Sequence, residues 1–285
     1  MKIALEGKSA NGYKSKHAIN SFQKRCGLRQ RRLFMTWNSV VVDHLIDVHA
    51  HLNAIEQCDR AIQSAQAVGV KQIVAVGMDL VSNRETLKLA SLYPNTVLPA
   101  IGYHPWMIDS EAVDETLSFI QNNLIDCVAL GEVGLDYKVK VKKRLQQEVF
   151  EAVLKIAAET QKPVIVHSRF SYERSFQMVS SAGITNAVFH WYSGPLEMLE
   201  RILQEGYYIS ATPALHYSRL HQAAANIAPL ERILVETDSP VEYQGKTSEP
   251  AHLIDTLVAL RRLKKKPLEE VAAVTTENAE RFFSL

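Results

Sequence analysis

Residues 45–52 read Leu-Ile-Asp-Val-His-Ala-His-Leu, a short apolar run that ends in two histidines one residue apart. Side chains alternate faces along a strand, so His49 and His51 project to the same side. Neutral imidazole nitrogens bind zinc and similar cations, and two of them aimed together can ligate one ion. The alternative is a pair of histidines at an ordinary strand end. A metal site here therefore requires acidic and histidine partners from elsewhere in the chain.

The chain beyond residue 40 alternates apolar β-branched runs with helical segments, which is the pattern of a repeated strand–helix unit. The apolar runs are continuous rather than alternating, as in parallel strands that are buried on both faces. We expect strands at 45–49, 71–78, 96–103, 127–132, 163–167, 187–190, 207–211 and 232–237. We expect helices at 55–68, 81–92, 111–124, 141–160, 172–182, 195–204, 216–227, 250–263 and 267–283.

Eight such units close most naturally into a (β/α)8 TIM barrel, an α/β fold. An open doubly wound sheet is the alternative, but no Gly-x-Gly-x-x-Gly follows the first strand, where a dinucleotide site would place it. The barrel makes a sharp prediction, because its functional side chains lie at the C-terminal ends of the strands.

Metal-competent side chains occur at these strand ends. They are His49, His51, Glu132, His167, His190 and Asp238. Each alone has a structural explanation, since a carboxylate can cap the following helix and a histidine can form hydrogen bonds at the barrel rim. A barrel brings all six to one mouth, and together they predict a metal centre.

Composition limits the remaining possibilities. Hydrophobic residues make up 47% of the 285 residues and charged residues 22%, which is typical of a globular protein with one large barrel or two average domains. No apolar run approaches the roughly 18 residues that span a membrane, so we expect no membrane contact. Cys26, Cys58 and Cys127 lack the spacing of a metal site and indicate a reducing compartment, so we expect a cytoplasmic protein.

The net charge of +1 conceals an asymmetry. Residues 1–34 hold nine Lys or Arg and one acid, so this leader carries about +8 and the rest of the chain about −7. The basic leader is compatible with three interpretations. It could be a nucleic-acid-binding arm, an organelle transit peptide, or a poorly ordered tail or sequence upstream of a start at Met35. We favour the last interpretation, and expect an extension at 1–40 and the (β/α)8 barrel domain at 41–285.

Six motifs in this order carry a resemblance to a known family. They are Asp-Val-His-Ala-His-Leu at 47–52, Gly-Tyr-His-Pro at 102–105, Gly-Glu-Val-Gly-Leu-Asp at 131–136, Pro-Val-Ile-Val-His-Ser-Arg at 163–169, His-Trp-Tyr-Ser-Gly at 190–194 and Glu-Thr-Asp-Ser-Pro at 236–240. In these motifs the chain resembles the TatD family of metal-dependent deoxyribonucleases, within the amidohydrolase superfamily. The resemblance covers roughly residues 45–284 and leaves the leader outside.

The resemblance implies two divalent metal ions per subunit, drawn from Zn, Mn, Mg, Co or Ni. One ion would be held by His49, His51 and Asp238, the other by His167 and His190, and Glu132 would bridge them. Asp238 and Glu132 are then the expected catalytic residues, with Asp238 as the general base for the nucleophilic water.

Substrate contacts are expected beside the metals. Arg169 is the first candidate, because a guanidinium group matches phosphate geometry. His104 and Tyr103 in the Gly-Tyr-His-Pro turn follow, together with Trp191, which stands where the family commonly has a small residue. Aromatic side chains near strand ends can stack on an unpaired base or simply pack in loops: Tyr103, Trp106, Tyr137, Trp191 and Tyr192.

The expected function is therefore a metal-dependent deoxyribonuclease, an exonuclease acting on DNA ends, that needs no obligate protein partner. The negative charge of the body argues against tight, non-specific duplex binding, which depends on Lys and Arg contacts to phosphates. One alternative is a hydrolase of a small amide, ester or lactone, which the acidic body and Trp191 favour. Another is a binding protein on a barrel scaffold, which six convergent ligands disfavour.

Overall fold

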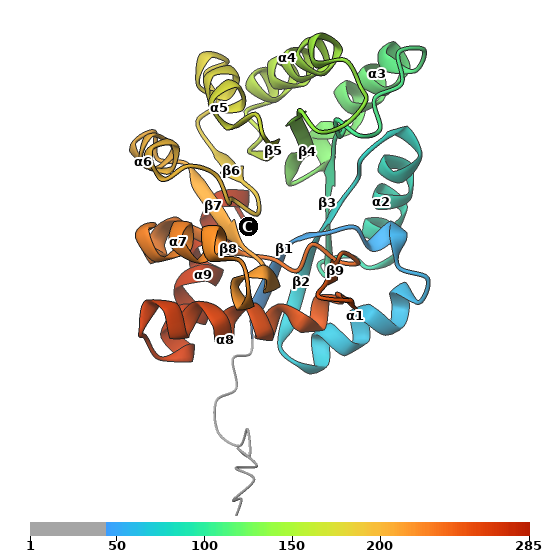
Figure 1. The fold of residues 1–285 in the computed structure, drawn as a ribbon. Helices are drawn as coiled ribbons and strands as arrows, with labels where there is room; N and C mark the ends of the chain where they lie inside the picture. Colours follow the sequence, from blue (N-terminus) through green and yellow to red (C-terminus); the bar gives the residue numbers. More distant parts are fainter. Residues whose placement is uncertain (1–43) are drawn as a thin grey trace, which may run out of the picture. The chain divides into compact units, whose positions relative to one another are not determined.

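Eight parallel strands lie in the order β1 to β8 and form a nearly closed barrel surrounded by helices, as the sequence predicts (Figure 1). The structure is a computed structural model that describes residues 44–285. The basic leader lies outside the described residues, so the expected division at residue 40 stays a prediction.

The barrel strands are β1 (Leu45–Ala50), β2 (Val70–Val76), β3 (Val97–Ile101), β4 (Ala129–Asp136), β5 (Val164–Arg169), β6 (Ala187–Phe189), β7 (Tyr208–Ala211) and β8 (Ile233–Val235). The helices are α1 (Cys58–Ala67), α2 (Leu80–Leu92), α3 (Val113–Asn123), α4 (Lys143–Thr160), α5 (Tyr172–Ser181), α6 (Leu196–Gln204), α7 (Arg219–Ile227), α8 (Leu253–Lys264) and α9 (Leu268–Phe283). Every one of them overlaps a predicted segment.

Two strand ends and one hairpin differ from the prediction. Strand β5 runs to Arg169, so His167 lies two residues before its end. Strand β4 continues to Asp136, so Glu132 lies inside it and not at its end, because Gly134, Leu135 and Asp136 go on pairing with β5. A small antiparallel hairpin, β9 (Glu242–Tyr243) and β10 (Lys246–Thr247), follows β8 and has no counterpart among the predicted elements.

Side chains from all eight strands fill the barrel interior. They are Ile46, Val48, Val74, Val76, Ala100, Ala129, Ile165, Val188, Tyr208 and Leu234. Helix α9 closes the N-terminal end of the barrel, where Phe282 packs with its ring centroid 5.4 Å from that of Tyr208 and Asn278 donates to the carbonyl oxygen of Ile233. The apolar filling of this end leaves polar side chains to the opposite mouth.

The seam between β1 and β8 is tied by hydrogen bonds on the mouth side. The backbone N–H of Asp238 donates to the carbonyl of His49 at 2.9 Å. Buried Asp47 accepts from the backbone N–H and the hydroxyl of Thr237 at 3.0 and 2.6 Å. The first and last strands therefore fix two parts of the predicted metal centre relative to each other.

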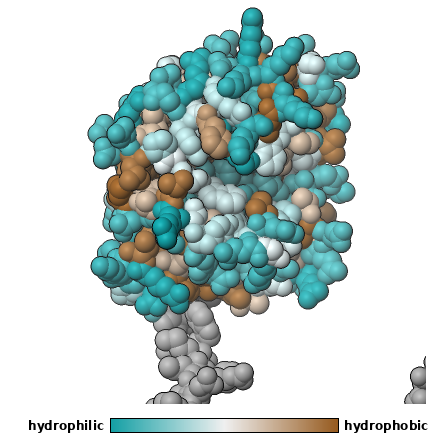
Figure 2. Space-filling view, in the orientation of Figure 1, coloured by the Kyte–Doolittle hydropathy of each residue, from teal (hydrophilic) through white to brown (hydrophobic). Residues whose placement is uncertain are grey.

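The mouth faces the viewer in Figure 1, since α9 lies behind the strands. On the same face Figure 2 shows mainly hydrophilic and intermediate side chains, with hydrophobic ones in small separate groups. Among residues 44–285, none of the helices combines the length and apolarity needed to cross a membrane.

Candidate metal centre

His49 and His51 leave β1 side by side and face two carboxylates. Their Nε2 atoms are 3.3 Å apart. Each lies 3.4 to 3.5 Å from Oε2 of Glu132 and 3.4 to 3.6 Å from Oδ1 of Asp238. All four side chains are at most 9% exposed, so this is a buried group of two nitrogen and two oxygen donors.

Glu132 presents its other oxygen to a second group of histidines. Its Oε1 lies 2.8 Å from Nδ1 of His167 and 2.8 Å from Nε2 of His190. Nε2 of His104 is 3.3 Å from the same oxygen. One carboxylate thus faces two separate donor groups, one with each oxygen.

Hydrogen bonds behind the histidines orient their rings. Nδ1 of His51 donates to the carbonyl of Val76 at 3.0 Å, and Nδ1 of His190 donates to Oε1 of Glu236 at 3.3 Å. In both rings Nε2 is then the atom turned toward Glu132. Such outer hydrogen bonds fix the tautomer and orientation of metal-binding histidines in proteins.

His104 is arranged differently. The backbone N–H of Trp106 donates to its Nδ1 at 3.1 Å, so the proton of the neutral ring lies on Nε2 and points to Glu132. Burial lowers the pKa of His104 to about 4, so the ring is neutral near pH 7. His104 therefore acts on Glu132 as a hydrogen-bond donor.

The centre buries carboxylates and histidines of opposite charge away from water. Burial alone would raise the pKa of Glu132, but the facing histidines hold it well below its usual range. Burial alone would lower the pKa of His190, but Glu132 and Glu236 raise it well above the ordinary value. The buried carboxylates favour positive charge beside them, which divalent cations can supply in place of protons on histidine.

Similarity to known proteins assigns the chain to a family. The profile of the family described as TatD related DNase matches residues 46–284. The chain belongs to the TatD family. It is 31% identical over 257 residues to the uncharacterised metal-dependent hydrolase YabD of Bacillus subtilis, covering 85% of this chain and 99% of YabD. It is 30% identical to tatdn3 of Danio rerio, covering 84% of this chain and 97% of tatdn3. That relative is named as a deoxyribonuclease.

A solved structure agrees with this assignment. The TatD homologue YjjV of Escherichia coli superposes with a TM-score of 0.78 at 25% sequence identity, over 86% of this chain and 99% of YjjV. The protein is thus a metal-dependent hydrolase of the TatD family with the expected barrel fold.

The donor set of this TatD barrel fits divalent cations. Imidazole nitrogens and carboxylate oxygens suit Zn, Mn, Co and Ni, and the carboxylates also suit Mg. Nδ1 of His49 and Oε2 of Glu236 are buried, and neither has a hydrogen-bond partner among the described residues. The predicted ligands His49, His51, Glu132, His167, His190 and Asp238 all lie in the two donor groups around Glu132.

The four residues expected at the substrate take different positions in the TatD site. Arg169 has 47% of its side chain exposed at the mouth, and its NH1 lies 4.0 Å from Oδ2 of Asp136. Trp191 is half-buried, with its ring 5.2 Å from that of Tyr243. His104 is only 2% exposed and lies behind Glu132, and Tyr103 is 2% exposed.

The structure does not support substrate contacts by Tyr103. Its ring is buried, and its hydroxyl donates to the carbonyl of Asp109 and accepts from the N–H of the same residue. Tyr192 is likewise buried and donates to the carbonyl of Pro195. Both aromatics are packing residues, because the loops that carry them fold over their rings.

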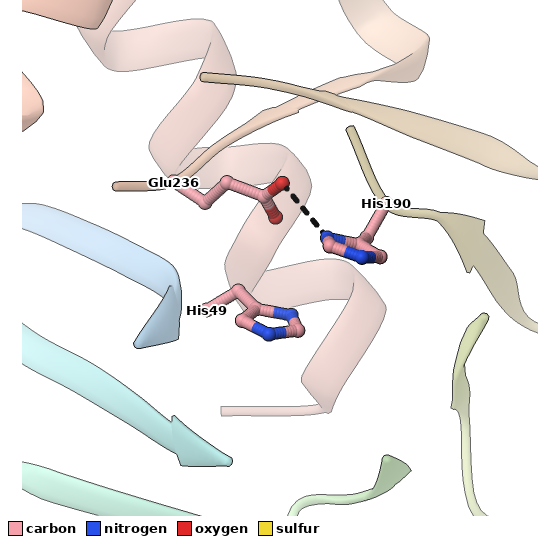
Figure 3. Close-up of side chains that lie close together, drawn as sticks. All are labelled: His49, His190 and Glu236. Carbon is pink, nitrogen blue, oxygen red and sulfur yellow. Dashed lines mark hydrogen bonds and ion pairs between the residues drawn. The ribbon is translucent and has the colours of Figure 1, made fainter. Parts of the chain in front are cut away.

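Two buried acids of the TatD site have no role assigned from the sequence. Asp136 is fully buried and accepts from Nε1 of Trp106 at 2.6 Å and from Nε2 of His167 at 3.3 Å. Burial would raise the pKa of Asp136, but these hydrogen bonds hold it well below its usual range. Glu236 is the second, and Figure 3 shows its carboxylate beside the rings of His49 and His190, with a hydrogen bond to His190.

The signal for both is present in the sequence. Asp136 follows Glu132 by four residues and Glu236 precedes Asp238 by two, so strand periodicity places each on the face of a predicted ligand.

Strained backbone marks three residues that follow the strand ends. Asp238, Trp191 and Phe170 have φ values of 51°, 42° and 55°, in the left-handed region that residues other than glycine seldom occupy. Such conformations persist where surrounding contacts over-determine them, and they cluster at functional sites. At Asp238 those contacts are the backbone bonds across the β1–β8 seam.

Proposed function

We propose that this TatD-family hydrolase is a deoxyribonuclease that hydrolyses phosphodiester bonds at DNA ends, with two divalent cations. The observation that carries the proposal is the position of Glu132, whose two oxygens face two separate groups of donors. A carboxylate in this position can bridge two cations, which is a common arrangement in enzymes that cleave phosphate esters.

We assign His49, His51 and Asp238 to one cation, His167 and His190 to the other, and Glu132 to both. Bound cations would lower the pKa of a water molecule and neutralise charge on a phosphoryl oxygen. The identity of the metal among Zn, Mn, Mg, Co and Ni depends on availability and geometry.

The protein residues would hold the reactants and move the proton. Asp238, whose Oδ1 lies beside both Nε2 atoms of the β1 histidines, would orient the nucleophilic water and accept its proton. Arg169, half-exposed at the mouth, would bind a non-bridging phosphate oxygen. His104 would keep Glu132 in place through its Nε2 proton.

The family description and the name of the Danio rerio relative support DNA as the substrate. Cys58 and Cys127 are free thiols, which supports our placement of the reaction in the cytoplasm. An esterase, lactonase or amidase is the second candidate, and the observation that favours it is Trp191, whose half-buried ring against Tyr243 adds bulk beside the centre.

The test is release of nucleotides from end-labelled single- and double-stranded DNA by metal-stripped protein with Mg, Mn or Zn added back. We expect cleavage that requires metal, stops with chelator, and falls about 100-fold or more in Asp238→Asn, the loss expected for a general base. Asp114→Asn is the control, because Asp114 is an exposed acid in the first turn of α3. If folded, metal-loaded protein leaves DNA intact and hydrolyses small esters, lactones or amides, the second candidate replaces the nuclease.

A further inference from the structure

Four side chains beside the metal centre expose aromatic and cationic groups at the mouth. They are Trp106, Lys138, Arg169 and Phe170, which we call the aromatic rim. Three of them are organised by one buried carboxylate. Oδ2 of Asp136 accepts from the indole of Trp106 and lies 4.0 Å from the guanidinium of Arg169, and Oδ1 accepts from the backbone N–H of Lys138 at 2.8 Å.

Trp106 is held rigidly yet remains open on one side. Its Nε1 donates to Asp136 at 2.6 Å, and its ring centroid lies 4.9 Å from that of His104 and 6.0 Å from that of His167. The residue is nevertheless 49% exposed. The indole of Trp106 is therefore fixed next to His167, a proposed metal ligand. Because its conformation is already restricted, binding a substrate costs little side-chain entropy.

Phe170 is presented to solvent by an unfavourable backbone. It is 62% exposed, and its φ of 55° is rare for a bulky side chain. Nζ of Lys138 lies 5.1 Å from its ring centroid, and the N–H of Tyr137 donates to the carbonyl of Arg169 at 3.0 Å, which ties the β4 and β5 loops together. Packing within the protein does not account for an exposed ring in this conformation.

We propose that the aromatic rim binds unpaired nucleotides, with a base stacked on Trp106 next to the metal centre, a neighbouring base on Phe170, and phosphates on Arg169 and Lys138. This inference rests on the proposed deoxyribonuclease function and specifies how its substrate is recognised. A planar base matches an exposed ring, and stacking tolerates every base, because each has a π-face. Cations interleaved with the rings match the phosphates between bases.

Charge argues for a strand end rather than a duplex. The chain outside the leader carries about −7, and the rim supplies two cations, so few phosphates can be neutralised. With two phosphates bound, the logarithm of the affinity should fall with the logarithm of salt concentration with a slope of about −1.4, since single strands give about −0.7 per phosphate.

The test is fluorescence anisotropy of a labelled tetranucleotide on the metal-stripped full chain, so that no hydrolysis intervenes. The comparison probe is the same tetranucleotide with abasic sugars. We expect Trp106→Leu to weaken binding of the normal oligonucleotide about 10-fold, as loss of one stacked base predicts. Binding of the abasic probe should not change, and Trp106→Phe should retain most of the affinity.

Charge variants separate phosphate contacts from stacking. Lys138→Gln and Arg169→Gln should weaken both probes equally and reduce the salt slope by about 0.7 each. Lys155→Gln is the matched control, because Lys155 lies on α4 with its side chain 78% exposed, outside the rim.

The inference and the proposed function fail in different ways. Equal binding of normal and abasic probes, or unchanged affinity in Trp106→Leu, overturns the aromatic rim even if metal-dependent cleavage of DNA is intact. Failure of wild-type protein to bind any oligonucleotide also overturns it. The cleavage assay with metal added back tests the nuclease proposal separately.

Discussion

Glu236 is fully buried, and one of its two carboxylate oxygens has no hydrogen-bond partner among the described residues. Its other oxygen accepts from Nδ1 of His190 and from the backbone N–H of Trp191 at 3.1 Å. One nitrogen of His49 and one of His190 lie within 4.8 Å of a Glu236 carboxylate oxygen and of each other, and the two rings stack with centroids 4.5 Å apart (Figure 3). Glu236 therefore orients His190 through a hydrogen bond and lies close to His49 without bonding to it.

Glu236→Gln tests this orienting role. We expect the affinity for Zn or Mn to fall about 10- to 100-fold, because loss of a partner behind a metal-binding histidine typically has that effect. The measurement is competition with a chromophoric chelator on metal-stripped protein. Glu242→Gln is the control, because Glu242 is exposed on β9. Equal metal affinity in wild type and Glu236→Gln would show that Glu236 only fills space.

At the residue scale, the sequence predicts where ligands gather better than what each does. His167 and His190 are placed by the barrel rule, which needs only strand ends. The rule does not tell whether a side chain near a strand end points into the open mouth or packs under a loop. Tyr103 packs under its loop and is buried. His104 is buried and turned toward Glu132, because its Nδ1 accepts from the backbone N–H of Trp106, and this bond depends on the backbone path of the turn.

At the element scale, the approach of β4 to β5 sets the distance between Glu132 and His167. Gly134 lies opposite His167 in this pair, with φ of 146°. A β-carbon at Gly134 would lie 2.0 Å from the carbonyl oxygen of His167, so the strands must separate. The absence of a side chain at this position is therefore a condition for the predicted metal centre.

Gly134→Ala should destabilise the protein by roughly 2 to 4 kcal/mol, as overpacking combined with a strained φ does. It should also weaken metal binding, because Glu132 and His167 move apart. Urea unfolding with a constant m-value measures the first effect and chelator competition the second. In the control, Gly183→Ala, the new methyl meets no atom within 4 Å and the φ of 71° adds strain alone. A cost no larger than that of the control would contradict the packing argument.

Element order is the part of the fold that the sequence predicts best, because hydrophobic periodicity reports it directly. Element ends are less accessible. Strand β4 extends to Asp136 because β5 offers partners for four more residues, Val133 to Asp136, and this pairing cannot be seen within the β4 sequence. The β9–β10 hairpin lacks the long apolar runs by which strands are recognised, so hydrophobic periodicity does not predict it.

At the scale of the whole molecule, the candidate metal centre joins the first and last strands of the barrel to its middle strands. The predicted ligands lie in or directly after β1, β4, β5 and β6, and in the segment after β8, so cations would cross-link elements far apart in sequence. Ligands that bind only the folded state stabilise it by mass action.

Metal removal should therefore lower the melting temperature. With metal at 100 times its dissociation constant the stabilisation is about 2.7 kcal/mol, which corresponds to about 5 to 10 °C for a domain of this size. Differential scanning fluorimetry of stripped and reloaded protein measures the shift. The shift should shrink in Asp238→Asn and persist in Asp114→Asn. Equal melting of stripped and reloaded wild-type protein would argue against a metal that bridges the barrel.

The basic leader provides the last test, because its charge is opposite to that of the barrel. The predicted domain 41–285 contains all six candidate ligands and the whole match to the family, which spans 46–284. We expect protein lacking residues 1–40 to keep the metal-dependent melting shift and the metal affinity of the full chain. If the leader binds no phosphates, the salt slope of oligonucleotide binding also stays the same. A slope that becomes shallower by about 0.7 for each phosphate that the leader neutralises in the full chain would instead assign it as a nucleic-acid arm.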